Sequence, residues 1–272
     1  MTLKLNNRTA LVTGAAGLLG IEHVKSLLSE GANVVCVDIS KENLLWLERE
    51  LEGFSYLGSL TFYELDITSE ESLENLRTHF LSNGTKIDIL VNNAALDPKV
   101  SSNFPQEDSS FENFPLSRWN SELNVNLTGS FLCCKIFGSE MAKRKSGVIV
   151  NISSDLSVIA PDNRLYSKNG EDIDNSRAKP VSYSVSKTAI IGLTRYLAAY
   201  WAHANIRVNS LSPGGVLNDQ PQEFLSRIEK LIPMGRMADP DEYRGALIFL
   251  CCDDSQYLTG QNLVMDGGRS II

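Results

Sequence analysis

Short apolar runs rich in Val and Ile alternate with longer stretches of helical periodicity, and no other feature of the chain restricts its fold as strongly. Strands that alternate with helices form parallel sheets, because each helix carries the chain back to the start of the next strand. The sequence therefore predicts a seven-stranded parallel sheet. The predicted strands are Thr9–Val12, Asn33–Val37, Leu60–Leu65, Ile87–Val91, Val148–Ile152, Ile206–Leu211 and Asn262–Met265.

Helical patterns fill the gaps between these strands. They cover Leu18–Ser29, Glu42–Glu52, Glu70–Leu81, Trp119–Arg144, Ser184–His203 and Asp239–Cys251. Strand–helix–strand crossovers are right-handed in nearly all proteins, so the economical topology is a doubly wound open sheet with helices on both faces. In such sheets the ligand crevice lies at the carboxyl ends of the strands. We therefore predict an α/β fold with a single doubly wound Rossmann-type domain over residues 1–272.

Composition excludes several classes of protein. Of the 272 residues 43% are hydrophobic, which is enough for a large core. The formal net charge of −8 would repel nucleic-acid phosphates. The chain has no apolar run of about 18 residues, and its first residues lack the apolar core of a signal peptide. We therefore expect a cytoplasmic protein without a nucleic-acid or membrane partner.

The five cysteines include two adjacent pairs, Cys133-Cys134 and Cys251-Cys252, inside apolar stretches. They have no His or Cys neighbours at the spacing of metal ligands. We therefore expect buried, reduced thiols and no metal site.

A glycine-rich segment follows the first predicted strand and opens the first predicted helix. Glycines let the backbone approach a pyrophosphate, and the helix start supplies unpaired N–H groups and the positive end of the helix dipole. This position favours a dinucleotide site over a merely tight turn. The residues predicted to bind the cofactor here are Gly14, Ala16, Gly17, Leu18, Leu19 and Gly20.

Side chains at later strand ends complete the predicted cofactor site. Asp38 ends the second strand, where a carboxylate accepts hydrogen bonds from the adenosine ribose and repels a 2′-phosphate, so we expect NAD rather than NADP. Its alternative role, a helix N-cap, is more naturally assigned to Ser40. Asp66 could contact adenine or cap the next helix. The other residues predicted to bind the cofactor here are Ile39, Ile67, Asn93, Ala94 and Ala95.

Tyr183 and Lys187 are candidate catalytic residues, because they occur as Tyr-x-x-x-Lys at the start of a predicted helix and residues four apart share one helix face. A phenol with a pKa of about 10 needs a nearby cation to act as a general base near neutrality. Lys187, together with the charge of an oxidised nicotinamide, can supply this effect. Ser154 follows the fifth predicted strand and Asn126 lies in the fourth predicted helix, so all four side chains are expected at one crevice.

Together these motifs resemble the short-chain dehydrogenase/reductase family of the compact, one-domain type, over essentially the whole chain. The resemblance implies NAD(P)-dependent alcohol oxidation or carbonyl reduction. It implies Tyr183 as the acid/base, Ser154 as the holder of the substrate oxygen, Lys187 as a ribose ligand that tunes Tyr183, and Asn126 as the anchor of a proton-relay water. The motifs that carry it are the glycine loop, Asp38, Asp66, Asn92-Asn93-Ala94, Asn126, Ser154, Tyr183, Lys187, Pro213-Gly214, Tyr257–Gln261 and Asp266-Gly267-Gly268.

The resemblance also implies cofactor contacts and an assembly. The implied contacts include Tyr183, Lys187, Pro213, Gly214 and Val216. The implied assembly is a homotetramer or homodimer formed through the long fourth and fifth helices and the C-terminal strand.

Two insertions, near residues 96–118 and 155–182, depart from the family pattern. The second one separates Ser154 from Tyr183 more widely than is usual. Tyr166 follows Ser154 at a spacing closer to the usual one, but the residue four positions after it is Gly170, where the Tyr-x-x-x-Lys motif requires a lysine. The second insertion either forms a solvated loop of mixed charge or clamps an anionic group of a polar substrate. Its cations are Arg164, Lys168, Arg177 and Lys179.

Finer features indicate the substrate class. The glycine spacing resembles that of the extended, sugar-nucleotide-modifying subgroup, and Asn218 stands where the family often has a threonine that holds the nicotinamide amide. The second insertion and the stretch Tyr257–Ser270 resemble oxidoreductases linked to flagellin modification and surface-polysaccharide sugar synthesis. We therefore predict an NAD-dependent oxidoreductase acting on a secondary alcohol or ketone of a sugar or nucleotide-sugar derivative. The alternatives are an epimerase or dehydratase that uses bound NAD transiently, and a non-enzymatic NAD-binding regulator.

Overall fold

The computed structural model describes residues 3–97, 109–166 and 178–272. In this part of the chain one parallel sheet has the strand order β3-β2-β1-β4-β5-β6-β7. Its strands are β1 (Thr9–Thr13), β2 (Asn33–Asp38), β3 (Leu60–Glu64), β4 (Ile89–Asn92), β5 (Gly147–Ile152), β6 (Ile206–Pro213) and β7 (Asn262–Met265). The predicted seven-stranded, doubly wound sheet is therefore confirmed.

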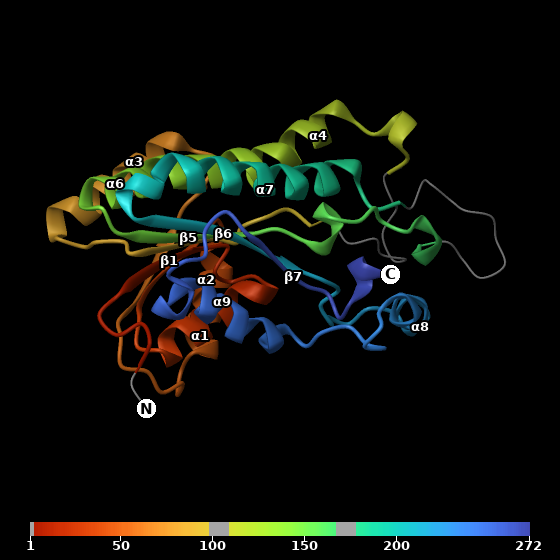
Figure 1. The fold of residues 1–272 in the computed structure, drawn as a ribbon, viewed down its shortest axis with the longest axis horizontal. Coiled ribbons are helices and arrows are strands. Elements are labelled where there is room, and N and C mark those ends of the chain that lie inside the picture. The colour runs from red at the N-terminus through yellow and green to blue at the C-terminus, as the bar shows by residue number, and fades with distance from the viewer. Residues whose placement is uncertain (1–2, 98–108, 167–177) are drawn as a thin grey trace.

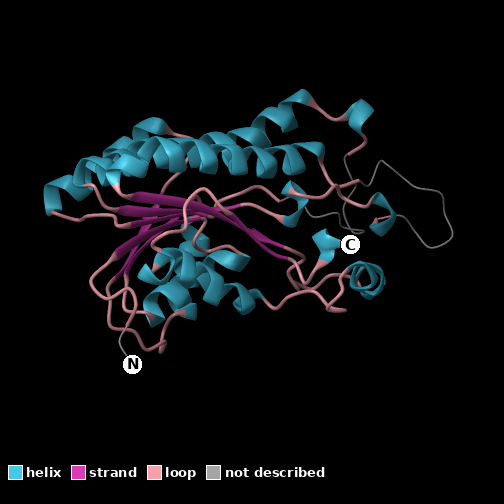
Figure 2. Ribbon diagram, in the orientation of Figure 1, coloured by secondary structure: helices cyan, strands magenta, loops and turns pink. Residues whose placement is uncertain are grey.

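Helices cover both faces of this sheet. They are α1 (Leu18–Ser29), α2 (Lys41–Glu50), α3 (Glu70–Asn83), α4 (Leu116–Leu123), α5 (Ser130–Cys133), α6 (Ser139–Arg144), α7 (Val181–Trp201), α8 (Gln222–Ile228) and α9 (Arg244–Cys251). Figures 1 and 2 show α1, α2 and α9 below the sheet, and α3, α7 and the run from α4 to α6 above it. None of the helices in the described ranges is both long and apolar enough to cross a bilayer.

Side chains of β1 alternate between two apolar cores. Ala10 and Val12 belong to the core beneath α1, α2 and α9, whereas Leu11 belongs to the core that includes Phe80 of α3 and Trp201 of α7. Because both faces of the sheet are covered, β1, β2, β4 and β5 are mostly apolar and buried on both sides. This explains why the strands are readable in the sequence as continuous apolar runs. All five cysteines are buried and unpaired, as predicted.

The predicted helix Trp119–Arg144 is one continuous coil that is not uniformly α-helical. The π-helical segments Asn124–Gly129 and Cys134–Gly138 separate α4 from α5 and α5 from α6. Segments of this kind are rare and occur frequently at functional sites. The first π-helical segment contains Asn126 and ends at Gly129, where a Cβ would lie 2.5 Å from Cδ1 of Ile67. The coil therefore packs closely against the loop that follows β3.

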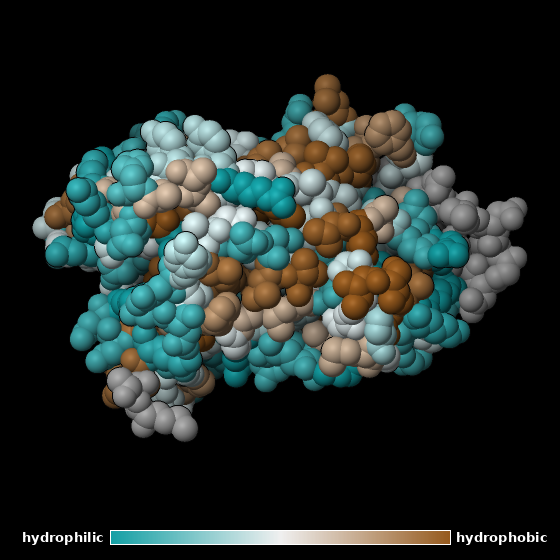
Figure 3. All heavy atoms as spheres, in the orientation of Figure 1, coloured by the Kyte–Doolittle hydropathy of each residue, from teal (hydrophilic) through white to brown (hydrophobic). Residues whose placement is uncertain are grey.

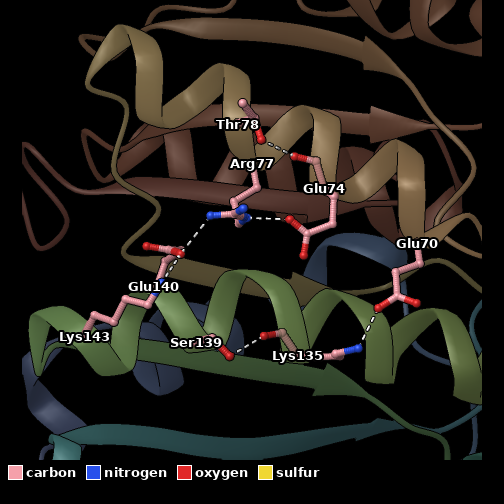
Figure 4. Close-up of polar contacts among 8 residues, drawn as sticks. All are labelled: Glu70, Glu74, Arg77, Thr78, Lys135, Ser139, Glu140 and Lys143. Carbon is pink, nitrogen blue, oxygen red and sulfur yellow. Dashed lines mark hydrogen bonds and ion pairs between the residues drawn. The ribbon is translucent and has the colours of Figure 1, made fainter.

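Ion pairs join α3 to the neighbouring helical run (Figure 4). Arg77 donates to Glu140 at 3.1 Å, and Lys135 pairs with Glu70 at 2.5 Å. Lys143 also pairs with Glu140 at 2.7 Å. Hydrogen bonds from Lys143 and Arg77 hold the pKa of the Glu140 carboxyl below its usual value. Exposed ion pairs each contribute about 1 kcal/mol or less. These contacts orient the helices, while the apolar core supplies most of the stability.

The position of β1 determines where a ligand can bind. β1 lies between β2 and β4, so the chain proceeds outward in one direction from β1 to β3 and then crosses to the other half of the sheet at β4. At such a reversal of strand order a crevice opens at the carboxyl ends of the strands. The glycine loop lies at this point, because it directly follows β1.

Candidate active site

A cavity of about 1010 Å³ extends along the carboxyl ends of the strands. Its volume lies at the upper end of the range of about 300–1,000 Å³ that is usual for small-molecule sites. Most of the predicted site residues line it: Gly14, Gly17, Leu18, Leu19, Asp38, Ile39, Asp66, Ile67, Asn93, Ala94, Ala95, Ser154, Tyr183, Lys187, Pro213, Gly214 and Val216. Three others, Ala16, Gly20 and Asn126, are not among the lining residues.

The glycine loop turns tightly between β1 and α1. Gly14 has a φ of +60°, and a Cβ on it would lie 2.7 Å from Cα of Ala94. A Cβ on Gly20 would lie 2.1 Å from the carbonyl oxygen of Gly14, so Gly20 permits the close packing of the loop on the helix. Gly17 is the N-cap of α1 and makes no side-chain capping bond. The first N–H groups of α1 are therefore suited to an anion.

Two backbone N–H groups hold the carboxylate of Asp38. Ala16 donates to Oδ2 at 3.2 Å, and Ser40 donates to Oδ1 at 3.1 Å. Ala16 therefore acts on the site through Asp38. The N-cap of α2 is Ser40, whose hydroxyl accepts from the backbone N–H of Asn43, so the predicted N-cap role of Ser40 is confirmed. The role of Asp38 at the ribose remains a prediction.

The loops after β3 and β4 close the same end of the cavity. Asp66 accepts hydrogen bonds from the backbone N–H and the hydroxyl of Thr68, both at 2.8 Å, whereas Ser69 caps α3. The alternative role of Asp66 as the helix cap is therefore wrong. Asn93 donates from Nδ2 to the carbonyl oxygen of Gly14 at 2.9 Å and fixes its loop against the glycine loop.

Tyr183 and Lys187 lie in the first two turns of α7 and face the cavity together. Lys187 Nζ donates to the carbonyl oxygen of Ile152 at 2.9 Å and lies 5.7 Å from the centre of the Tyr183 ring. The Lys187 residue is only 4% exposed. The end of β5 thus fixes the ammonium group beside the phenol.

Burial dominates the ionisation of this pair. It lowers the pKa of Lys187 to about 8 and raises the pKa of Tyr183 well above its ordinary value. The carboxylate of Asp97 raises both values, and a hydrogen bond with Ser154 lowers the pKa of Tyr183. In the protein alone, burial therefore opposes ionisation of the Tyr183 phenol.

Ser154 follows β5 and is held by its own neighbours. Its hydroxyl donates to Oδ1 of Asp155 at 3.0 Å and accepts from the N–H of Leu156 at 3.2 Å. Arg269 donates to Oδ2 of Asp155 at 2.8 Å, and both of these side chains are buried. Burial raises the pKa of the Asp155 carboxyl, and Arg269 opposes this shift. Sequence reasoning missed Asp155 and Arg269, although one directly follows Ser154 and the other directly follows the Asp266-Gly267-Gly268 motif.

Asn126 lies behind the cavity wall. Its Oδ1 accepts from the N–H of Leu96 at 2.7 Å, and its Nδ2 donates to the carbonyl oxygen of Leu96 at 3.1 Å and to Oγ of Ser186 at 3.2 Å. Asn126 therefore ties the loop after β4 to α7. Its predicted role as the anchor of a proton-relay water remains a prediction.

The ends of both predicted insertions reach the cavity. Lys179 lines it, pairs with Asp97, and places its Nζ 4.3 Å from the centre of the Tyr183 ring. Arg164 is exposed and pairs with Asp162 at 2.6 Å. Residues 98–108 and 167–177 lie outside the described part of the chain, and with them the predicted cations Lys168 and Arg177.

Tyr166 and α8 form another wall that the sequence did not predict. The rings of Tyr166 and Phe224 lie 5.8 Å apart, and Arg227 donates to the carbonyl oxygen of Leu165 at 3.1 Å. Burial raises the pKa of Tyr166 to about 12. Tyr166 thus packs against α8, whereas Tyr183 lies beside Lys187. Asn218, the expected nicotinamide contact, also lines the cavity.

The sheet is doubly wound, and one cavity brings together a glycine turn at a helix start, a carboxylate at the end of β2, and a Ser, a Tyr and a Lys. This combination is typical of a dinucleotide-dependent oxidoreductase. Comparison with known families agrees. The chain belongs to the short-chain dehydrogenase family, whose model matches residues 8–227.

Curated relatives match nearly the full length. The chain is 34% identical to an NAD-dependent glycerol dehydrogenase of Listeria innocua, covering 98% of this chain and 95% of the relative. It is 32% identical to a D-threitol dehydrogenase of Mycolicibacterium smegmatis, with the same coverage. It is 33% identical to the post-translational flagellin modification protein A of Campylobacter coli, covering 97% and 98%. The predicted resemblance to flagellin-modification proteins is therefore confirmed.

Solved structures agree with the fold. A short-chain dehydrogenase from Leptospira borgpetersenii with bound NAD⁺ superposes with a TM-score of 0.83 at 29% identity, covering 98% of this chain and 94% of that one. A gluconate 5-dehydrogenase from Burkholderia cenocepacia, in complex with NADP and tartrate, has a TM-score of 0.83 at 27% identity, covering 100% and 98%.

Proposed function

We propose that the protein is an NAD-dependent oxidoreductase that transfers a hydride between nicotinamide and a secondary alcohol or ketone of a polyol or sugar. One observation carries this proposal. The hydroxyl groups of Ser154 and Tyr183 and the ammonium group of Lys187 border the same cavity as the glycine loop and Asp38. A substrate in this cavity can therefore meet both the acid/base group and a dinucleotide.

The residues at one end of the cavity fit NAD. Gly14 leaves no room for a Cβ, and the uncapped start of α1 offers N–H donors to a pyrophosphate. Asp38, fixed by two backbone donors, suits two ribose hydroxyls and opposes a 2′-phosphate. The Listeria relative is named as NAD-dependent and the Leptospira structure holds NAD⁺, while the Burkholderia structure holds NADP. Asp38 therefore supports NAD for this chain.

The chemistry follows from the other end of the cavity. NAD⁺, when bound, accepts the hydride from the carbinol carbon. Tyr183 takes the hydroxyl proton of the alcohol during oxidation and returns it to the carbonyl oxygen during reduction. Lys187, held by the carbonyl of Ile152, favours the ionised phenol, and Ser154 orients the substrate oxygen. Asn126 supports this arrangement by fixing the adjoining loop to α7.

The charges around the cavity favour an uncharged substrate. Four lysine or arginine side chains are among the described lining residues. Lys179 pairs with Asp97, Arg269 with Asp155 and Arg227 with Glu223, whereas Lys187 donates to the carbonyl oxygen of Ile152. A paired cation attracts an anionic substrate less strongly, whereas paired ammonium and carboxylate groups suit hydroxyl groups. The names glycerol dehydrogenase and D-threitol dehydrogenase of two relatives support the same class. We therefore favour a polyol or sugar over a nucleotide-sugar.

A substrate panel tests the proposal. The purified protein is incubated with NAD⁺ or NADP⁺ and linear polyols, aldoses and gluconate, and NADH formation is followed by absorbance. We expect NADH with a polyol or sugar. Conversion of a sugar-nucleotide without net NADH would instead support an epimerase or dehydratase, and tight NAD binding without turnover of any alcohol would support a regulator.

A further part of the proposal concerns assembly. Tyr196 and Tyr200 of α7 are 65% and 58% exposed, and their rings stack with centres 5.8 Å apart. Figure 3 shows apolar side chains gathered over the middle of the face that carries α7 and the C-terminal segment. Exposed apolar patches of this kind favour contact with another chain. We therefore propose a homotetramer or homodimer, which light scattering would detect.

A further inference from the structure

Two lysines flank the reactive tyrosine in sequence. Lys179 precedes Tyr183 by four residues, and Lys187 follows it by four. Lys179 lies in the connection just before α7, and its Nζ is 4.3 Å from the ring centre, against 5.7 Å for Lys187. The lysine nearer to the ring is therefore the one outside the Tyr-x-x-x-Lys motif.

The position of Lys179 is fixed by an ion pair. Its Nζ donates to Oδ1 of Asp97, in the loop after β4. The Lys179 side chain is only 12% exposed, whereas that of Asp97 is 55% exposed. Both residues line the cavity. Asp97 therefore holds the ammonium group over the ring from the solvent side of the cavity.

We propose that Lys179 is a second cation that promotes the reactivity of Tyr183, and that Asp97 positions Lys179 and partly offsets its charge. This inference rests on the proposed function, because it takes Tyr183 as the acid/base of the reaction.

The physical basis is the charge distribution of the ring. A cation over the face of an aromatic ring is attracted to its negative π-surface. The attraction grows when the phenol loses its proton, because the new charge spreads into the ring. Coulomb interactions increase as distance falls, and the Nζ of Lys179 lies closer to the ring centre than that of Lys187, so Lys179 is placed to stabilise charge that spreads into the ring. Asp97 acts in the opposite sense, because a carboxylate near the ring favours the neutral phenol.

Other charged and titratable groups around the Tyr183 ring also affect its ionisation, in addition to the Lys179–Asp97 pair. Asp155 and Tyr166 also face Tyr183 and raise its pKa, in addition to burial and Asp97. Asp155 is itself paired with Arg269. Lys179 lowers the pKa of Lys187 and Asp97 raises it, since like charges repel and opposite charges attract. Removing one member of the Lys179–Asp97 pair should therefore shift the ionisation of the site, with opposite signs for the two members.

The consequence for the reaction is a change in its pH dependence. During oxidation the proton leaves the alcohol oxygen and forms a bond to the phenolate oxygen of Tyr183. Only the ionised tyrosine can accept this proton, so the acid limb of the rate profile reports the ionisation. Loss of Lys179 moves this limb to higher pH, and loss of Asp97 charge moves it to lower pH.

The experiment compares Lys179→Met, Lys179→Arg, Asp97→Asn and the double variant of Lys179→Met with Asp97→Asn. Two readouts are used. The first is the pH profile of kcat/KM for whichever alcohol the enzyme oxidises. The second needs no substrate: the near-ultraviolet phenolate absorbance of the NAD⁺-saturated protein is titrated, and the same titration of Tyr183→Phe is subtracted. Arg164→Met is the control, because it breaks an exposed ion pair in the same insertion.

We expect Lys179→Met to raise the apparent pKa by about one unit, Asp97→Asn to lower it, and Lys179→Arg to stay near the parent value. The apparent pKa of the double variant should lie between the values of the two single variants. Arg164→Met should leave the apparent pKa unchanged. Unchanged titrations, or shifts of the same sign for Lys179→Met and Asp97→Asn, would overturn the inference. Opposite shifts in the phenolate titration, without NADH formation from any polyol or sugar, would support the inference and reject the proposed substrate class.

Discussion

Arg269, next to the C-terminus, forms a buried ion pair with Asp155, whose other carboxylate oxygen accepts the proton of the Ser154 hydroxyl. The bond from Arg269 Nη1 to Asp155 Oδ2 is 2.8 Å long and joins residues 114 positions apart. The segment after β7 therefore helps to fix Ser154, which is proposed to orient the substrate oxygen.

Breaking this pair should be costly. Arg269→Met leaves the Asp155 carboxylate buried without its counter-ion, which typically destabilises a protein by about 3–5 kcal/mol. We expect a loss of this size in the free energy of unfolding, measured with urea. The double variant of Arg269→Met with Asp155→Leu should recover most of it, because no buried charge remains. Equal stability of Arg269→Met and the parent would show that the pair contributes nothing net.

Cofactor choice should depend on Asp38. With its carboxylate fixed toward the ribose site, NAD should bind about tenfold or more tightly than NADP, a difference of about 1.4 kcal/mol. Asp38→Ala should reduce the difference between the two affinities, chiefly by weakening the binding of NAD. Titration calorimetry with both dinucleotides measures this. Equal affinities in the parent protein would refute the role of Asp38.

Substitution of the two tyrosines at the cavity should affect turnover very differently. Tyr183→Phe should remove nearly all turnover and leave NAD affinity within a few-fold, because the lost hydroxyl acts on the substrate proton. Tyr166→Phe should be mild, since Tyr166 packs against Phe224. Steady-state kinetics and NAD binding are measured for both variants. If Tyr166→Phe were the inactivating change, the assignment across the second insertion would be wrong.

Lys187 should make stability depend on pH. Burial lowers its pKa from 10.5 to about 8, so the unfolded chain binds this proton more readily. The free energy of unfolding therefore increases as the pH rises from about 8 to about 10.5, because the penalty for burying the charged ammonium group disappears over this range. Below that window Lys187→Met should be more stable than the parent, by up to about 3 kcal/mol, although it should lose activity. Urea unfolding at several pH values, with Lys135→Met as a surface control, tests this. A difference independent of pH would contradict it.

Much of the fold was predictable because periodicity and strand ends are local features. The strands β1, β2, β4 and β5 are mostly apolar on both faces, and Asp38, Ser154 and the Tyr183–Lys187 pair all lie at ends of predicted elements. The helix α8 was not predictable, because its seven residues are too few to show a clear period. The π-helical segments likewise change hydrogen bonding without changing the apolar pattern.

The missed site residues depend on long-range contacts. Asp155–Arg269 and Asp97–Lys179 are ion pairs between distant segments, and nothing in a single sequence indicates which charges meet. From the sequence, Lys179 belongs either to a solvated loop of mixed charge or to a clamp for an anionic group of the substrate. Its contacts with Asp97 and the Tyr183 ring are the basis of the proposed effect on Tyr183, and they could not be read from the sequence.

The most direct test of the proposed chemistry follows a deuterium atom. A polyol or sugar that supports NADH formation is prepared with deuterium at its carbinol carbons and incubated with the protein and NAD⁺, and the NADH is analysed by mass spectrometry. Direct hydride transfer predicts one deuterium in each NADH, an equal amount of ketone, and neither product with Tyr183→Phe. NADH without deuterium, or ketone formed without NADH, would contradict the proposed function.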